Sequence, residues 1–450
     1  MPLIALVLCI VLIFWLLTIE RKQNPKISWA TWIPTFWMAK VASHDLAYWL
    51  GKGDAEPGSG SPYERYLLLL LFFVGLYIVY RRRSDWYKTL KGNIWVTILI
   101  SYMSLSIFWT PLPLEIALKR LVKELIAVVM GLVVISEDST WKAMESILRR
   151  YIYILIPLSL LLVLFFPDHG TQPFGNLTAW VGVTNHKNTL GRLCCISVFF
   201  LTWDLVRKGF KQSLSTGRYV IWPDVLVLAA TVFLFKGPGP VKSLPVASII
   251  SSSIGVSVLF GYLYLKALRR YVRTGVLKLI VAGIIVVGTA SVFAGGLVTG
   301  GEVTSSFGRE ETLTGRTKIW AVVLPYAMQE PIIGHGIDGF FAGPEYGQRF
   351  TGHSHNGYLE IICDYGFVGL FFVSMFLLSS CGKAQQLMQG DFAWGIFWIS
   401  FLILSAIYDI AEPALKTFTS QHMAILLFLS FASSVTRNSF RSQKDDLSVE

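Results

Sequence analysis

The stretch that decides the fold reads Gly352-His-Ser-His-Asn-Gly-Tyr-Leu-Glu-Ile-Ile-Cys-Asp-Tyr-Gly-Phe-Val-Gly-Leu370. Its polar start ends the longest hydrophilic connection in the chain, residues 297–355. Its apolar remainder opens a run over residues 357–380 with the length and composition of a membrane-spanning helix. The pattern therefore predicts that His355 and Asn356 lie at a membrane surface, where a helix enters the lipid.

The rest of the chain is also strongly apolar. Apolar side chains make up 54% of the 450 residues and charged ones only 15%, which is too apolar for a soluble protein of this size. Runs approaching the length of a spanning helix occur at 3–19, 27–43, 66–80, 94–109, 121–136, 151–166, 188–206, 220–235, 245–265, 276–296, 357–380, 392–410 and 421–435. We therefore predict an all-α integral membrane protein, one polytopic domain over residues 1–450 with about 12–13 transmembrane helices. The run at 27–43 contains Pro34 and Lys40, so it could instead lie in the membrane interface.

The orientation follows from the basic residues, because those in short loops stay on the cytoplasmic side. Arg81-Arg82-Arg83 sets the first anchor, and threading the other runs from it also places Arg149-Arg150 and Arg207-Lys208 in the cytoplasm. The same threading places residues 297–355 on the outer face. The net charge of +11 is then a topology signal, and a nucleic-acid partner need not be invoked.

A first candidate site surrounds His355. A neutral imidazole at this position could accept a proton from an attacking hydroxyl, and His353 could do likewise. Asn356, Glu360 and Asp364 are spaced by four residues, so they share one face of a helix whose N-terminus favours an anion. The two acids could instead only complement the helix dipole, and His353 could be an inert interfacial histidine. No metal site is predicted, because the histidines follow no recognised ligand spacing.

A second candidate site is cationic. Guanidinium groups bind phosphate oxygens in pairs, and the diphosphate of a lipid would need several cationic partners. Polar groups that the threading places in the outer loop or at outer helix ends are Arg316, Arg349, Lys187, Lys242, His186 and Asn188. We predict that Lys187, Lys242, Arg349 and His186 assist Arg316 in binding a diphosphate. These side chains could instead pair with acids of the loop or with lipid phosphates.

Three motifs in this region occur in a characteristic order. Leu313-Thr-Gly-Arg-Thr-Lys-Ile-Trp320 is followed by Pro331-Ile-Ile-Gly-His-Gly336 and then by His355-Asn356 with Gly366. In order and spacing they resemble the signature domain of the O-antigen ligase and exopolysaccharide polymerase superfamily. His186-Lys-Asn188 with Gly191 is similar to the exopolysaccharide polymerase branch, so the ligase-like region extends over residues 182–380.

The resemblance implies a many-helix glycosyltransferase that works without a metal, nucleotide or other cofactor at the periplasmic face of the bacterial inner membrane. Its donor would be a glycan on undecaprenyl diphosphate, its acceptor a sugar or lipid A core, and residues 297–355 its long periplasmic loop among membrane lipids. The family's loop arginine corresponds to Arg316 and its histidine to His355. A second family arginine is replaced by Lys242, which supplies charge but no guanidinium fork and so disfavours a ligase in the narrow sense.

The mechanism that we expect is an inverting displacement. An acceptor hydroxyl loses its proton to His355 while it attacks the anomeric carbon, and Arg316 holds the leaving diphosphate. A transporter that flips lipid-linked glycans is the alternative, but it would need polar groups through the bilayer, whereas the runs at 66–80, 94–109 and 151–166 contain no charged residue. Polymerase and ligase differ in the acceptor and both stay open, although His186-Lys-Asn188 favours a polymerase.

Overall fold

A computed structural model describes residues 1–51, 61–174, 177–209, 221–239, 245–264, 274–297, 312–343 and 353–446. The single domain that the sequence predicts has two compact units. The first unit comprises Met1–Ser84 and Val129–Tyr264, and the second comprises Asp85–Val128 and Leu265–Glu450. The predicted class, an all-α integral membrane protein, is confirmed.

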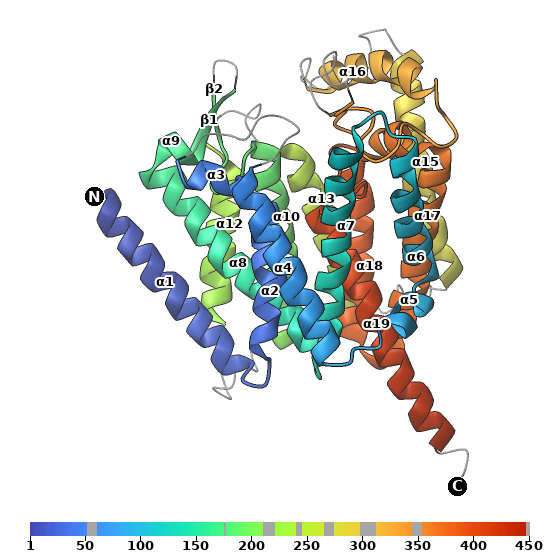
Figure 1. Cartoon of the computed structure of the whole chain (residues 1–450). Coiled ribbons are helices and arrows are strands. Elements are labelled where there is room, and N and C mark those ends of the chain that lie inside the picture. The colour runs from blue at the N-terminus through green and yellow to red at the C-terminus, as the bar shows by residue number, and fades with distance from the viewer. Residues whose placement is uncertain are drawn as a thin grey trace. The chain divides into compact units, whose positions relative to one another are not determined.

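The first unit consists of helices and one small hairpin (Figure 1). Its elements are α1 (Pro2–Gln23), η1 (Trp29–Thr31), α2 (Trp32–Ala42), α3 (Leu46–Trp49), α4 (Pro62–Arg81), α8 (Thr140–Phe165), α9 (Pro167–Gly170), β1 (Thr171–Phe174), β2 (Leu177–Trp180), α10 (Lys187–Lys208), α12 (Trp222–Lys236) and α13 (Val246–Tyr264). The two strands are antiparallel, with Thr171 opposite Trp180. The start of α4 is encoded locally, since Ser61 accepts a hydrogen bond from the backbone N–H of Tyr63 and Pro62 occupies the first turn.

Buried charges lie among three helices of the first unit. The guanidinium of Arg149 on α8 pairs with Asp204 on α10, and its Nε lies 3.4 Å from Asp224 on α12. These positions are near the start of α8, the end of α10 and the start of α12, and residues 151–166 remain without charge. Each buried charge therefore has an opposite charge beside it, as burial requires.

The second unit consists of helices only, among the residues that the structure describes (Figure 1). Its elements are α5 (Trp86–Gly92), α6 (Ile94–Leu105), η2 (Ser106–Phe108), α15 (Thr274–Leu297), α16 (Thr312–Ala327), α17 (Gly357–Gly390), α18 (Phe392–Asp409) and α19 (Gln421–Asp446). Helix α7 (Leu114–Ile135) begins in the second unit and ends in the first. Within the second unit, α16 lies at one end of α15 and α17, and α5 lies near their other end (Figure 1).

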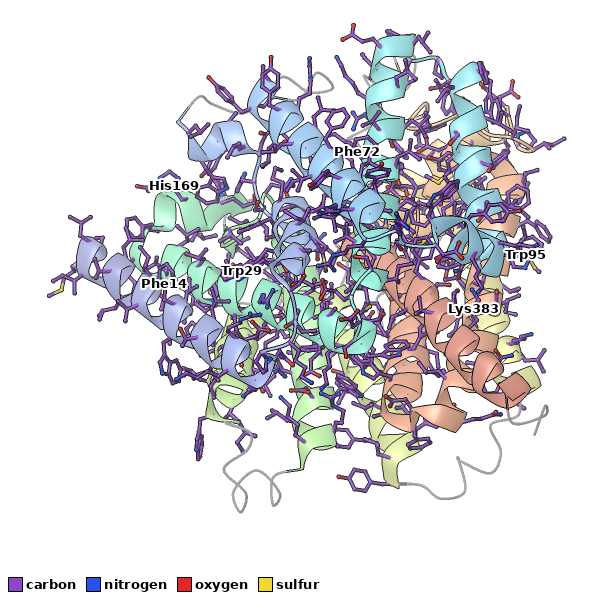
Figure 2. The ribbon with its side chains drawn as sticks, turned by 60° about the horizontal axis from the view of Figure 1, so that its bottom comes forward. Phe14, Trp29, Phe72, Trp95, His169 and Lys383 are labelled. Atoms are coloured by element: carbon purple, nitrogen blue, oxygen red, sulfur yellow. The ribbon has the colours of Figure 1, made fainter. Side chains whose placement is uncertain are left out.

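Fewer helices than the roughly 12–13 predicted spans meet the length and composition of a span within the described residues. Among the described residues, eight helices are long and apolar enough to cross a membrane, or nine if the bent pair α5 and α6 is one span. Of the other predicted runs, α2 and α12 have 11 and 15 residues, α7 carries too many charges, and the apolar part of α19 ends at Val435. Apolar side chains cover the outward faces of the spans; Phe14 of α1, labelled in Figure 2, is 67% exposed.

The bend between α5 and α6 is held by one buried amide. The two helices meet at 99° next to Asn93, whose side chain donates to the hydroxyl of Ser434 at 2.7 Å and accepts from the hydroxyl of Ser430 at 2.7 Å. Lys383 of α17, labelled in Figure 2, also donates to this amide oxygen. A single asparagine thereby joins α5, α6, α17 and α19 at the end of the second unit that lies away from α16.

Candidate functional site

The entry into α17 positions His355. Asn356 caps the helix by accepting a hydrogen bond from the backbone N–H of Leu359 at 3.0 Å, and its amide donates to the carbonyl of Ile410 at 3.0 Å. His355 has a φ of +56°, a left-handed conformation that is strained for a side chain of this kind. Gly357 follows because a Cβ there would lie 2.0 Å from a carboxylate oxygen of Asp409. The backbone at His355 is thus held in a left-handed conformation directly before the helix start.

The first half of α17 ends at a break that the sequence motif Pro331–Gly336 fills. Gly366 has a φ of +63°, and a Cβ on it would lie 2.2 Å from the carbonyl oxygen of Ile332. Two carbonyls next to the break accept hydrogen bonds from this motif. The carbonyl of Cys363 accepts from the N–H of His335 at 3.0 Å, and the carbonyl of Asp364 accepts from the N–H of Gly336 at 2.7 Å. Motifs separate in the sequence therefore form one packed structure, which makes residues 357–365 a short rigid segment.

Arg316 and His355 both contact a third residue, Glu412. Nη2 of Arg316 donates to Oε1 of Glu412 at 2.9 Å, and Nδ1 of His355 lies 3.0 Å from the same oxygen. Glu412 is 5% exposed, whereas the guanidinium and the imidazole are 24% and 23% exposed. The two residues that the sequence singled out are therefore adjacent, with a buried carboxylate behind them and their outer atoms accessible.

A second ionic group lies beside the first. Nζ of Lys416 is 2.7 Å from Asp364, 3.2 Å from Asp338 and 3.5 Å from Glu360. Glu360 also accepts a hydrogen bond from the backbone N–H of Ser354 at 3.0 Å, directly before His355. Lys416 and its three carboxylates thereby connect the segment that carries Glu412 with the start of α17.

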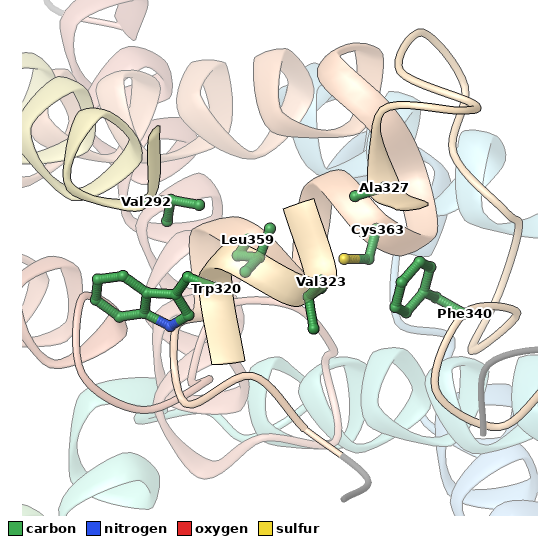
Figure 3. Close-up of a cluster of buried hydrophobic side chains, with 7 residues drawn as sticks. All are labelled: Val292, Trp320, Val323, Ala327, Phe340, Leu359 and Cys363. Atoms are coloured by element: carbon green, nitrogen blue, oxygen red, sulfur yellow. The ribbon is translucent and has the colours of Figure 1, made fainter. Parts of the chain in front are cut away.

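An apolar cluster packs α16 against α15 and α17 beside the site. It consists of Val292, Trp320, Val323, Ala327, Phe340, Leu359 and Cys363, drawn in Figure 3. The indole Nε1 of Trp320 donates to the carbonyl of Ser354 at 2.9 Å. Packing of α16 against α17 thus places Arg316, one turn before Trp320, next to His355.

His353, Asp338 and Lys416, which lie outside the spans, have shifted pKa values. Burial lowers the pKa of His353, whose ring lies 4.4 Å from that of His355. Burial alone would raise the pKa of Asp338, but Lys416 and Arg120 outweigh it and the pKa lies below its usual range. Burial would likewise lower the pKa of Lys416, yet Asp364, Asp338 and Glu360 raise it well above the usual value. Lys416 and Asp338 are therefore charged near neutral pH, and His353 is neutral.

The other predicted site residues are not all in this group. His353, Asn356 and Glu360 lie in it, as described above. His186, Lys187 and Asn188 belong to the first unit, where Nδ1 of His186 accepts from the N–H of Asn188 at 3.2 Å and caps α10. Lys242 and Arg349 lie outside the described residues. Within the described part of the chain, no group of three or more His, Cys, Asp or Glu side chains is arranged to hold a metal ion.

Sequence reasoning missed Glu412 and Lys416. A signal was present, because Asp409, Glu412 and Lys416 are the only Asp, Glu, Lys or Arg residues between positions 392 and 436. Isolated charges at the end of an apolar helix are candidates for function. Nothing in the sequence paired them with His355, since the contact between Glu412 and His355 spans 57 positions.

The chain is similar to known proteins in the region of this site. A protein family described as O-antigen ligase matches residues 246–374, which contain Arg316 and His355. The exopolysaccharide production protein ExoQ of Rhizobium meliloti (strain 1021) is 24% identical over 331 residues, covering 68% of this chain and 69% of that protein. Glu412 and Lys416 lie beyond the end of the family match.

Proposed function

We propose that this chain, a multi-pass membrane protein that belongs to the O-antigen ligase and polysaccharide polymerase superfamily, is a glycosyltransferase of polysaccharide synthesis at the periplasmic face of the bacterial inner membrane. Its donor is a glycan on undecaprenyl diphosphate, and its acceptor is a sugar. One observation carries the proposal: Arg316 and His355 share the carboxylate of Glu412 at the end of α17.

In this proposal His355 is the general base. Because Nδ1 of the imidazole lies against Glu412, that nitrogen carries the hydrogen and Nε2 is left to accept a proton. The acceptor hydroxyl gives its proton to Nε2 as its oxygen bonds to the anomeric carbon, and the bond from that carbon to the diphosphate breaks. One displacement of this kind inverts the anomeric centre. Glu412 then balances the imidazolium that forms.

Arg316 is proposed to hold the departing diphosphate. One Nη of its guanidinium donates to Glu412, and we propose that its other N–H groups bind phosphate oxygens. The diphosphate leaves as an anion and needs no proton, so cations stabilise the departing group more than a general acid would. The proposal includes no metal ion. Lys187, Lys242, Arg349 and His186 are proposed as further diphosphate partners. Asn356 and Glu360 are proposed to hold the loop of His355 in place, and Asn188 and His353 are proposed as further supporting residues of the site.

Among acceptors we favour a growing polysaccharide chain. The relative ExoQ is an exopolysaccharide production protein, and Lys242 stands where many ligases have an arginine. Transfer to lipid A core is the other acceptor chemistry for the same donor.

A transporter of lipid-linked glycans is less well supported. The buried ion pairs of Arg149 with Asp204 and Asp224 lie near one end of α8, α10 and α12, and residues 151–166 of α8 carry no charge. A polar path across the bilayer would need charges or polar groups at several depths.

The test is glycan transfer by the purified full chain in lipid, with an undecaprenyl-diphosphate-linked donor. We expect His355→Ala and Arg316→Ala each to lower the rate roughly 100-fold or more, and product from the wild type to have the inverted anomeric configuration. Near-normal rates in both variants would show that these residues are not the transfer site. Movement of the lipid-linked donor between leaflets without any transfer would favour the transporter.

A further inference from the structure

We propose that Lys416 is an electrostatic positioning residue of the transfer site: its ammonium neutralises the carboxylates beside His355, so that an anionic diphosphate can approach and the imidazole stays available as a base. This inference rests on the proposed function. Lys416 pairs with Glu360, Asp364 and Asp338, and it acts on the imidazole through these acids.

The geometry gives Lys416 three carboxylate partners from two chain segments. Asp364 and Glu360 come from α17, and Asp338 from the turns after α16. Asp364 also accepts a hydrogen bond from the backbone N–H of Phe340 at 3.1 Å. The side chain of Lys416 is only 14% exposed, so water screens these interactions weakly.

In the ion pairs around the imidazole, four carboxylates face three cations. The charged and titratable groups of the described residues that face this region are Arg316 from α16, Asp338 from the turns after it, His353 before α17, Glu360 and Asp364 from α17, Glu412 and Lys416 from residues 411–420, and Arg120, Lys123 and Glu124 from α7. Arg120 lies 3.4 Å from Asp338, and Glu124 accepts from the N–H of Phe418 at 2.6 Å. Among the described residues, Lys416 is the only cation paired with Glu360 or Asp364.

Loss of this ammonium would therefore have two effects on the reaction. Unbalanced carboxylates stabilise an imidazolium, which cannot act as a base, and they repel the phosphates of the donor. The pKa of His353 depends on the same charges. Burial lowers this pKa, Glu360 raises it and Lys416 lowers it further. A merely structural lysine would change stability without moving either the pH profile or the donor's KM.

The test compares charge variants of the full chain in lipid. For Lys416→Met we expect the pH of half-maximal transfer on the acid side to rise by about one unit and the KM for the lipid-diphosphate donor to rise roughly tenfold. Lys416→Arg keeps the charge and should stay close to the wild type. Lys40→Met is the matched control, because Lys40 is 13% exposed and pairs with Glu64 at 3.2 Å in the first unit; its profile should be unchanged.

A compensating variant separates charge from shape. Asp364→Asn keeps an oxygen for the N–H of Phe340 but removes one of the unbalanced charges, so Lys416→Met with Asp364→Asn should return the pH midpoint part of the way. An unchanged midpoint and KM in Lys416→Met overturns the inference, as does a double variant no closer to the wild type. If Lys416→Met does not fold, the folded double variant is compared with Asp364→Asn alone, and identical midpoints overturn the inference. Loss of activity in His355→Ala and Arg316→Ala alongside any of these outcomes leaves the proposed function standing.

Discussion

At the scale of single residues, the proposed site depends on Glu412. Glu412→Gln keeps the size of the side chain but removes the charge that faces both Arg316 and His355. We expect the rate of glycan transfer to fall roughly 100-fold or more, because the imidazolium formed during transfer loses its counter-charge. Initial rates at saturating donor and acceptor measure this loss.

Glu137 provides a matched control for that substitution. It is 4% exposed and pairs with Arg82 in the first unit, much as Glu412 at 5% pairs with Arg316. Glu137→Gln should lose a comparable amount of thermal stability and keep its transfer rate. A Glu412→Gln protein whose rate stays within threefold of the wild type would remove Glu412 from the mechanism.

At the scale of elements, the break in α17 holds residues 357–365, which directly follow His355, in position. Gly366→Ala forces a side chain into a left-handed conformation and places its Cβ 2.2 Å from the carbonyl of Ile332. We expect the free energy of unfolding to fall by at least about 2 kcal/mol, with loss of transfer because residues 357–365 shift. Gly382→Ala in the same helix is the control, since the nearest atom to its Cβ is 3.9 Å away. Equal melting temperatures for the two variants would mean that the break is not under this constraint.

At the scale of the whole molecule, the proposed orientation can be tested by labelling. Glu330 lies at the α16 end of the second unit and Lys88 on α5 near the other end, and both are exposed. All five native cysteines are buried, so their background reaction should be low. In spheroplasts, a membrane-impermeant thiol reagent should modify a cysteine at position 330 and reach one at position 88 only after lysis. The reverse pattern would place the site in the cytoplasm and exclude a periplasmic reaction.

The sequence by itself determined the membrane class, the resemblance to the O-antigen ligase superfamily and the two leading residues of the proposed site. Apolar run length is a property of consecutive residues, and the motifs at 313–320, 331–336 and 355–356 are read in place. The limits of single helices were predicted less well, because an apolar run does not reveal where α2 or α12 ends or that α6 meets α5 at a bend.

Only the tertiary structure decided how the site is assembled. The sequence predicts one continuous helix over 357–380, whereas a turn some thirty positions earlier inserts at Gly366 and breaks it. Likewise, Glu412 reaches Arg316 across 96 positions only because α18 returns the chain to the start of α17. A charged residue in an apolar segment can be predicted to need a partner. Which residue is that partner follows only from the tertiary structure.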